Sequence, residues 1–129
     1  MKKKIMIIDD EADFCFFLKR NIEASGRFEV DTVSESARAV QQVRLFKPDL
    51  ILLDVMMPGM SGSDVAAEIK RDENTRSVPI VFLTAIVNEA EVKQNRNCIG
   101  GWMYLSKPVQ IEELNDLVAR LLPEKAERT

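Results

Sequence analysis

Three acidic residues follow apolar runs, at positions that predict the ends of buried strands. Asp54 comes directly after the run 50–53, and Asp9 and Asp10 come directly after the run 5–8. An apolar run without alternation is typical of a strand that is covered on both faces, as in a parallel sheet. Carboxylates gathered at one edge of such a sheet repel one another by roughly 4 kcal/mol per pair at ~4 Å and an effective dielectric of about 20. A hard divalent cation with oxygen ligands, such as Mg²⁺, offsets this repulsion.

Two further polar side chains complete a set that suits phosphoryl transfer. Thr84 follows the apolar run 79–83, and Lys107 closely follows the segment 102–105. A metal and a lysine neutralise charge on the phosphoryl oxygens, a hydroxyl donates a hydrogen bond to them, and a carboxylate attacks in line. Asp54 is the predicted acceptor, because it lies centrally among the acids and ends the most buried strand.

Each of these residues also has a simpler interpretation. Asp9 and Asp10 could cap the helix that follows them and interact with its positive end. Thr84 alone would be an ordinary β-branched strand residue, and Lys107 alone would be a solvated charge. The whole set, however, is much less expected by chance than any one of its members.

Alternating strands and helices predict the sheet that brings these residues together. The predicted strands are the segments 5–8, 28–33, 50–54, 79–83 and 102–105. Helical periodicity follows each strand, over residues 11–24, 34–46, 61–71, 88–97 and 111–122. Repeated β-α units imply a single doubly wound α/β domain, with a parallel sheet, right-handed crossovers and helices on both faces. All five strands then end at one edge of the sheet.

The apolar positions of the first helix predict which of its faces is buried. Phe14, Phe17, Leu18 and Ile22 are expected to share the inward face. At about 100° per residue, Phe16 falls on the opposite side of the helix, where it is expected to be exposed.

Polar residues mark the beginnings of the next two helices. Ser34 is the expected N-cap of the second helix, whose inward residues are expected to be Ala37, Val40 and Val43. Ser61 is followed three residues later by an acid, which resembles a capping box, so the third helix is expected to begin there.

Composition limits the classes of function that the chain can have. Its 129 residues are enough for one domain with one core, and its 46% apolar and 30% charged residues are typical of a globular protein. The net charge of −3 argues against direct nucleic-acid binding, and the sequence has no histidine for acid–base catalysis or metal ligation. The two cysteines are too few to suggest a disulfide framework or a zinc site. Without an apolar run of membrane-spanning length or a signal peptide, a cytoplasmic location is expected.

The chain resembles a response-regulator receiver domain of bacterial two-component signalling, and its length is similar to that of the stand-alone chemotaxis and sporulation receivers. The matching segments are 7–11 (IIDDE), 52–62 (LLDVMMPGMSG), 83–85 (LTA) and 104–108 (YLSKP). The resemblance implies a flavodoxin-like (βα)5 fold with the strand order 2-1-3-4-5. We expect residues 1–122 to form this domain and residues 123–129 to form a charged C-terminal tail.

The resemblance also implies roles for the acids of the set. Asp54 stands at the family's phosphoacceptor position. Asp10 and Asp54 would hold Mg²⁺ through their carboxylates, and Met56 would hold it through its backbone carbonyl. Asp9 would act through the acidic pocket and a metal-bound water. The expected activity is that of a phosphoacceptor regulator, which catalyses only its own phosphorylation and dephosphorylation.

The remaining implied roles concern switching. Thr84 would move to bond the phosphoryl group, Lys107 would pair with it, and Tyr104 would pack inward as the switch aromatic. The resemblance further implies a cis peptide bond between Lys107 and Pro108.

Two kinds of protein partner are implied. A histidine kinase or a histidine phosphotransfer protein would deliver the phosphoryl group, and its helical bundle would pack against the first helix, on which Phe16 and Asn21 lie. A downstream protein target would bind the face formed by the fourth helix, the fifth strand and the last helix.

Small departures from the commonest family pattern affect the expected lifetime of the phosphorylated state. Gly101 stands where alanine is frequent. Met56 and Ile86 are both apolar, at positions that flank the path of an attacking water, so the aspartyl phosphate is expected to be comparatively long-lived.

Alternative functions remain open from the sequence. A flavodoxin-like nucleotide or flavin binder would share the fold and its binding edge, but its phosphate loop would follow the first strand, where this chain has acids. An aspartyl phosphatase would place two acids after one strand in an Asp-x-Asp pattern. A receiver-like domain that binds partners without accepting phosphate, or a receiver cut from a larger regulator, would also fit the pattern of elements.

Overall fold

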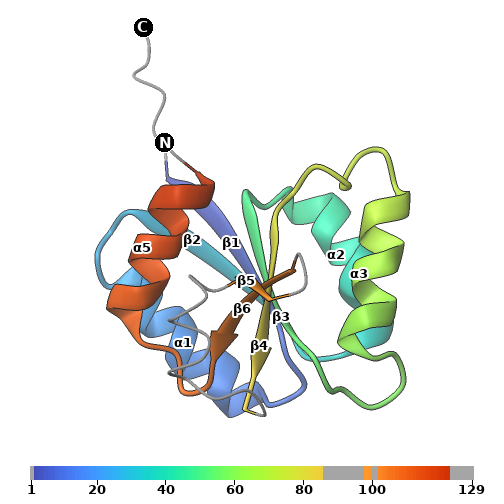
Figure 1. Ribbon diagram of the computed structural model, residues 1–129, viewed down its shortest axis with the longest axis horizontal. Helices are drawn as coiled ribbons and strands as arrows, with labels where there is room; N and C mark the ends of the chain where they lie inside the picture. Colours follow the sequence, from blue (N-terminus) through green and yellow to red (C-terminus); the bar gives the residue numbers. More distant parts are fainter. Residues whose placement is uncertain (1, 86–97, 100–101, 123–129) are drawn as a thin grey trace, which may run out of the picture.

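The apolar runs form one sheet in the computed structural model, which describes residues 2–85, 98–99 and 102–122. Within this part of the chain the strands are β1 (Lys3–Ile8), β2 (Phe28–Val33), β3 (Leu50–Asp54), β4 (Ile80–Thr84), β5 (Cys98–Ile99) and β6 (Trp102–Ser106). Five of them run parallel in the order β2-β1-β3-β4-β6, and β5 pairs antiparallel with β6 at the edge (Figure 1). The predicted order 2-1-3-4-5 is therefore confirmed, with β6 as the fifth predicted strand. The two-residue β5 was not predicted, because it is too short to show a pattern.

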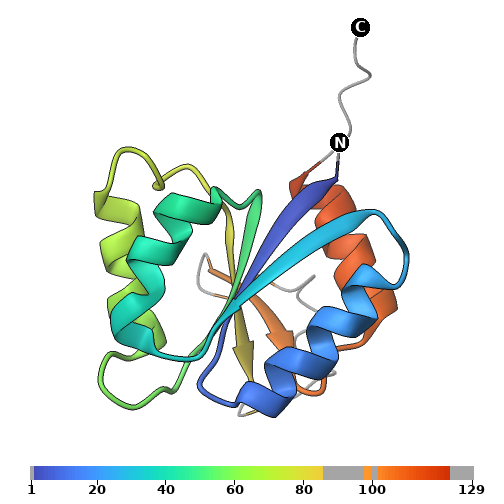
Figure 2. The same cartoon turned by 180° about the vertical axis from the view of Figure 1, so that it is seen from behind.

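Helices cover both faces of the sheet. They are α1 (Ala12–Glu23), α2 (Ala39–Phe46), α3 (Gly62–Arg71) and α5 (Ile111–Leu121), with a short 3₁₀ turn, η1 (Ser36–Arg38), before α2. α1 and α5 lie on one side of the sheet, and α2 and α3 lie on the other (Figures 1 and 2). The predicted helix 88–97 and the predicted tail 123–129 lie outside the described residues.

The central strands are buried along their whole length. Every residue of β3 and of β4 is buried, which explains why both read as continuous apolar runs. Side chains of β1 alternate between two cores: Ile5 and Ile7 pack with α1 and α5, whereas Met6 and Ile8 pack with α2 and α3. This burial on both faces fixes the register of the strands and thus the position of the residues at their ends.

The capping box of α3 forms as predicted. Ser61 Oγ accepts a hydrogen bond of 3.2 Å from the backbone N–H of Asp64, and an Asp64 carboxylate oxygen accepts one of 3.3 Å from the N–H of Ser61. The next residue must be glycine, since a Cβ at Gly62 would lie 2.3 Å from the carbonyl oxygen of Asp54. The first turn of α3 thus packs directly against the end of β3.

Burial on α1 differs from the prediction. Phe17 was expected to face inward, but it is 59% exposed, whereas Cys15 is buried together with Leu18 and Ile22. Phe14, also expected inward, is half-buried. The buried stripe is centred on residues spaced three and four apart from Cys15, and a phenylalanine two positions after that cysteine falls on the other side of the helix.

The start of α2 was also predicted wrongly. Ser34 caps no helix, and a 3₁₀ turn with Glu35 at its N-cap precedes α2. Because a 3₁₀ turn has three residues per turn, it changes the phase of the chain, so that Ala39 rather than Ala37 is buried beside Val43.

Candidate functional site

The predicted site residues meet at the carboxyl edge of the sheet. Asp9 directly follows β1, Asp54 ends β3, Thr84 ends β4 and Lys107 directly follows β6. The arrowheads of β4 and β6 in Figure 1 point to this edge. An open cavity of about 280 Å³ lies here, lined by Asp10, Glu11, Asp54, Val55, Met56, Thr84, Ala85 and Lys107. Ligands of doubly wound α/β proteins bind at this edge.

Three carboxylates lie close enough together to share one cation. Asp9, Asp10 and Asp54 each offer an oxygen, and these oxygens lie within 4.8 Å of one another. Asp9 is fully buried, Asp54 is 7% exposed and Asp10 is exposed. A set of hard carboxylate oxygens beside an open cavity fits Mg²⁺, which binds one or two carboxylates and retains several waters.

Lys107 is the cation of this cluster. Its Nζ lies 2.8 Å from Asp9 Oδ2, 3.3 Å from Asp54 Oδ1 and 3.3 Å from Glu11 Oε1. The same Nζ lies 4.5 Å from the centre of the Phe14 ring, which faces the ammonium group. Burial acts to lower the pKa of Lys107, but the hydrogen bond and charge of Asp9, with the charge of Asp54, outweigh burial and raise this pKa above its ordinary value. Lys107 is therefore charged at neutral pH.

Asp54 has a perturbed carboxylate. Burial, followed by the negative charge of Asp9, raises the pKa of Asp54 from 3.8 to about 6, although Lys107 partly opposes the shift. At neutral pH Asp54 is still mostly ionised, and a cation in the cluster would stabilise the ionised form further.

Asp9 is fixed by its neighbours. Asp9 Oδ1 accepts a hydrogen bond of 2.9 Å from the N–H of Glu11, and the N–H of Asp9 donates one of 3.0 Å to the carbonyl of Val33. The thiol of Cys15 donates to the Asp9 carbonyl over 3.3 Å. Burial and then the charge of Asp9 raise the pKa of Cys15 to about 12, so this thiol stays neutral. The N-cap residue of α1 is Glu11, which makes no side-chain capping bond.

Thr84 and Tyr104 lie on neighbouring strands. Thr84 is 5% exposed, and its carbonyl accepts a hydrogen bond of 3.0 Å from the N–H of Lys107. Tyr104 is half-buried on the face of α2 and α3, with its ring 5.5 Å from that of Phe82. The peptide bond between Lys107 and Pro108 is cis, as expected.

Phe16 lies outside the cavity, on the outer surface of α1. It is 55% exposed, and its ring packs edge-on against the exposed ring of Phe17, with the two ring centres 5.4 Å apart. The guanidinium of Arg20 lies 5.7 Å from the centre of the Phe16 ring. The sequence correctly predicted the exposure of Phe16, but it missed the contacts of Glu11 and Phe14 with Lys107. Glu11, at the N-cap of α1, and Phe14, on α1, are far from Lys107 in the sequence, so no local pattern marked these contacts.

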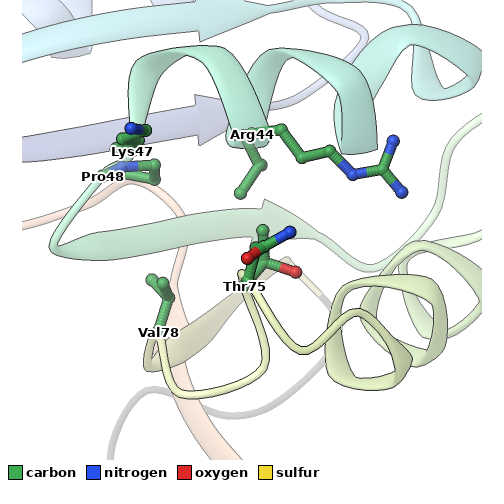
Figure 3. Close-up of a pocket in the computed structure, with 7 residues that line it drawn as sticks. Arg44, Lys47, Pro48, Thr75 and Val78 are labelled. Carbon is green, nitrogen blue, oxygen red and sulfur yellow. The ribbon is translucent and has the colours of Figure 1, made fainter.

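A larger cavity lies at the opposite edge of the sheet. It measures about 560 Å³ and lies where β3 and β4 begin (Figure 3). Its lining consists of Val43, Arg44, Lys47, Pro48, Asn74, Thr75 and Val78. Arg44 extends away from Lys47 and Pro48 in Figure 3 and is paired with Asp72. Among the residues that the structure describes, no carboxylate lines this cavity, so the acidic edge remains the candidate site.

The fold and the site together define a class of protein: a doubly wound α/β domain that gathers carboxylates around a lysine at its carboxyl edge. The family model for the response regulator receiver domain matches residues 5–119. This chain belongs to that family, and it is a signalling regulator of the two-component type.

Relatives of known name support the assignment. The chain is 34% identical over 122 residues to the alkaline phosphatase synthesis transcriptional regulatory protein PhoP of Bacillus subtilis, covering 95% of this chain and 49% of PhoP. It is 40% identical over 119 residues to the phosphate regulon transcriptional regulatory protein PhoB of Pseudomonas aeruginosa, covering 92% of this chain and 50% of PhoB. The chain thus spans about half the length of these relatives.

Solved structures show the same fold. The receiver domain of Francisella response regulator 1452 is similar with a TM-score of 0.71 and 26% identity, over 93% of this chain and 96% of that one. The chemotaxis protein CheY4 of Vibrio cholerae is similar in fold, with a TM-score of 0.76 and 24% identity over 95% of this chain and all of CheY4, 100%. Among the described helices of this chain, none has the length and apolar character needed to cross a bilayer.

Proposed function

We propose that this domain accepts a phosphoryl group on Asp54 in a Mg²⁺-dependent reaction and changes its protein contacts in response. One observation carries the proposal: the carboxylate of Asp54 lies at an open cavity, within 4.8 Å of oxygens of Asp9 and Asp10 and 3.3 Å from the ammonium of Lys107. A nucleophile that lies beside both candidate cation ligands and a fixed positive charge is suited to phosphoryl transfer.

The reaction would form one bond and break another. The Asp54 carboxylate makes a new P–O bond while the P–N bond of a phosphohistidine breaks, and the electron pair of that bond stays on the imidazole, which takes up a proton from solvent. Asp10, Asp54 and the Met56 carbonyl would hold Mg²⁺, which would supply positive charge to offset that of the phosphoryl oxygens. Lys107 pairs with one phosphoryl oxygen, and Thr84 donates its hydroxyl to another. Asp9 keeps Lys107 in place.

Switching would follow from these contacts. A phosphoryl group that binds Thr84 and Lys107 would displace residues at the ends of two adjacent strands, β4 and β6. Tyr104 lies on β6 and is half-buried against Phe82, so a shift of β6 would alter its packing. The output face would include β6 and α5, together with the predicted helix 88–97, and phosphorylation would bias two states of this face.

The phosphodonor would be a histidine kinase or a histidine phosphotransfer protein that docks on α1. This helix begins next to the acidic cavity, so a donor that delivers a phosphoryl group to Asp54 must approach it. Phe16 offers an exposed apolar contact there, and the exposed ring of Phe17 beside it enlarges the surface.

The extent of the protein and its output are part of the proposal. We place the receiver unit at residues 1–122, consistent with the family match over 5–119. The relatives PhoP and PhoB are named transcriptional regulators, and the chain covers about half of each. The acidic net charge of −3 supports the view that this domain acts through protein partners rather than by binding nucleic acid itself. Transfer from a kinase supports a cytoplasmic location.

Intact-protein mass spectrometry with a small-molecule phosphodonor and Mg²⁺ tests the function. The protein should gain one phosphoryl mass, and the Asp54→Ala variant should gain none. Labelling that persists in that variant would refute the acceptor assignment. An unlabelled wild-type protein would favour a partner-binding domain or a nucleotide binder, and release of inorganic phosphate from phosphomonoesters would indicate a phosphatase.

A further inference from the structure

The loop between β3 and α3, residues 55–61, forms one wall of the acidic cavity. Val55 and Met56 line that cavity, and Met56 is 66% exposed. The loop passes through Gly59, whose φ of +84° lies in the left-handed region that favours glycine. An exposed loop of this kind must be held by contacts from elsewhere in the fold if its backbone is to keep a defined position.

Ser36 provides such a contact. It belongs to η1, the 3₁₀ turn that directly precedes α2, and is 7% exposed. Its hydroxyl donates a hydrogen bond of 3.1 Å to the carbonyl of Pro58 and accepts one of 3.1 Å from the N–H of Met60. One buried hydroxyl thus uses both its donor and its acceptor on the two backbone groups that flank Gly59.

The packing around Ser36 is close. A Cβ at Gly59 would lie 3.3 Å from Ser36 Oγ, so the loop lies directly against the serine. At the far end of the loop, the N–H of Gly62 donates to the carbonyl of Val55 over 2.9 Å. The two ends of the loop are therefore closed on each other, and Ser36 ties its middle to η1.

We propose that Ser36 is a positioning residue for the β3–α3 loop, and that it sets the affinity of the acidic site for Mg²⁺ through the backbone of Met56. This role rests on the proposed function, in which the Met56 carbonyl is a metal ligand. Residues that hold a metal ligand in place alter metal affinity by about 10- to 100-fold when they are removed. Ser36 would act in the same way on a main-chain ligand.

The test compares Ser36→Ala with Ser34→Ala in the full chain. The control makes the same substitution two residues earlier, at an exposed serine. Amide hydrogen exchange in the presence of a chelator should become faster over residues 55–61 in Ser36→Ala only, while the amides of β1 stay protected in both variants. This measurement needs no metal, and the protection of β1 shows that the fold is intact.

Metal binding and transfer supply the functional readouts. Mg²⁺ titration, followed by NMR shifts of the residues that line the acidic cavity, should show about tenfold weaker binding in Ser36→Ala. The rate of phosphorylation by a small-molecule donor should fall at subsaturating Mg²⁺ and return to the wild-type rate at saturating Mg²⁺, since the defect lies in metal affinity. A merely structural role would not give this separation.

Each other outcome overturns the inference. Unchanged exchange over residues 55–61 in Ser36→Ala shows that the serine does not hold the loop. Faster exchange with unchanged Mg²⁺ affinity shows that the loop position does not set metal binding. If the wild-type protein binds no Mg²⁺ and gains no phosphoryl mass, the proposed function is overturned, and this role of Ser36 with it. If the wild-type protein binds Mg²⁺ and gains the phosphoryl mass, but Ser36→Ala has the same Mg²⁺ affinity as the wild type, only the role of Ser36 is overturned.

Discussion

The Asp54→Asn variant should be more stable than the wild type at neutral and higher pH when Mg²⁺ is absent. Burial and the charge of Asp9 raise the pKa of Asp54 from 3.8 to about 6. Asp54 is buried, with 10% of its side chain exposed, so little of this cost is relieved by solvent. The shift corresponds to about 3 kcal/mol by which folding disfavours the ionised carboxylate, and an amide of the same shape removes that cost.

The sign of the pH dependence follows from the direction of the shift. Because the folded protein keeps a proton on Asp54 up to a higher pH than the unfolded chain does, wild-type stability rises as the pH falls from about 6 towards about 4. The advantage of Asp54→Asn should therefore be about 2–3 kcal/mol at about pH 8 and should shrink towards about pH 4.

Urea unfolding of both proteins, in the presence of a chelator and at a series of pH values, measures this difference directly. Asp116→Asn, a matched change at an exposed acid on α5, is the control and should show little pH-dependent difference from the wild type. If Asp54→Asn is destabilising at about pH 8, or if its effect is the same at all pH values, the reasoning about burial and crowding is refuted.

The remaining predictions concern the other site residues. Asp10→Asn should weaken Mg²⁺ binding by a factor of about ten or more, measured by titration, and an unchanged affinity would remove this residue from the metal site. Lys107→Met should lower the free energy of unfolding by about 3 kcal/mol or more at neutral pH, because it leaves a buried carboxylate without its cation. A free energy of unfolding, measured in urea, that lies within about 1 kcal/mol of the wild-type value would contradict this. Replacing both Met56 and Ile86 by Asn or Glu should speed loss of the phosphoryl group, followed by intact mass, and an equal or slower rate would show that these positions do not control access of water. Phe16→Ala should slow transfer from a cognate kinase or phosphotransfer protein but leave the rate from a small-molecule donor unchanged; equal effects on both rates would remove Phe16 from the docking surface.

Local patterns in the sequence determined most of the fold. The continuous apolar runs of β3 and β4 predicted strands buried on both faces, and every residue of these strands is buried. The β-α alternation predicted a parallel sheet, and the capping box at Ser61 predicted where α3 begins. These features depend on residues that are close in the chain, so a reading of the sequence could find them. The convergence of acids at strand ends follows from the same topology, because parallel strands must all end at one edge.

Tertiary structure alone decided how the surrounding side chains meet. The exposure of Phe17 and the burial of Cys15 depend on the rotation at which α1 docks on the sheet, and both residues are apolar enough to occupy either side. The 3₁₀ turn that buries Ser36 and brings its hydroxyl to the β3–α3 loop has no strong signal in the sequence. Likewise, Glu11 and Phe14 contact Lys107, although they lie near the N-terminus of the chain and Lys107 lies near its C-terminus. Contacts of this kind depend on crossover geometry and helix rotation, and the pattern of apolar residues specifies those only to within a fraction of a turn.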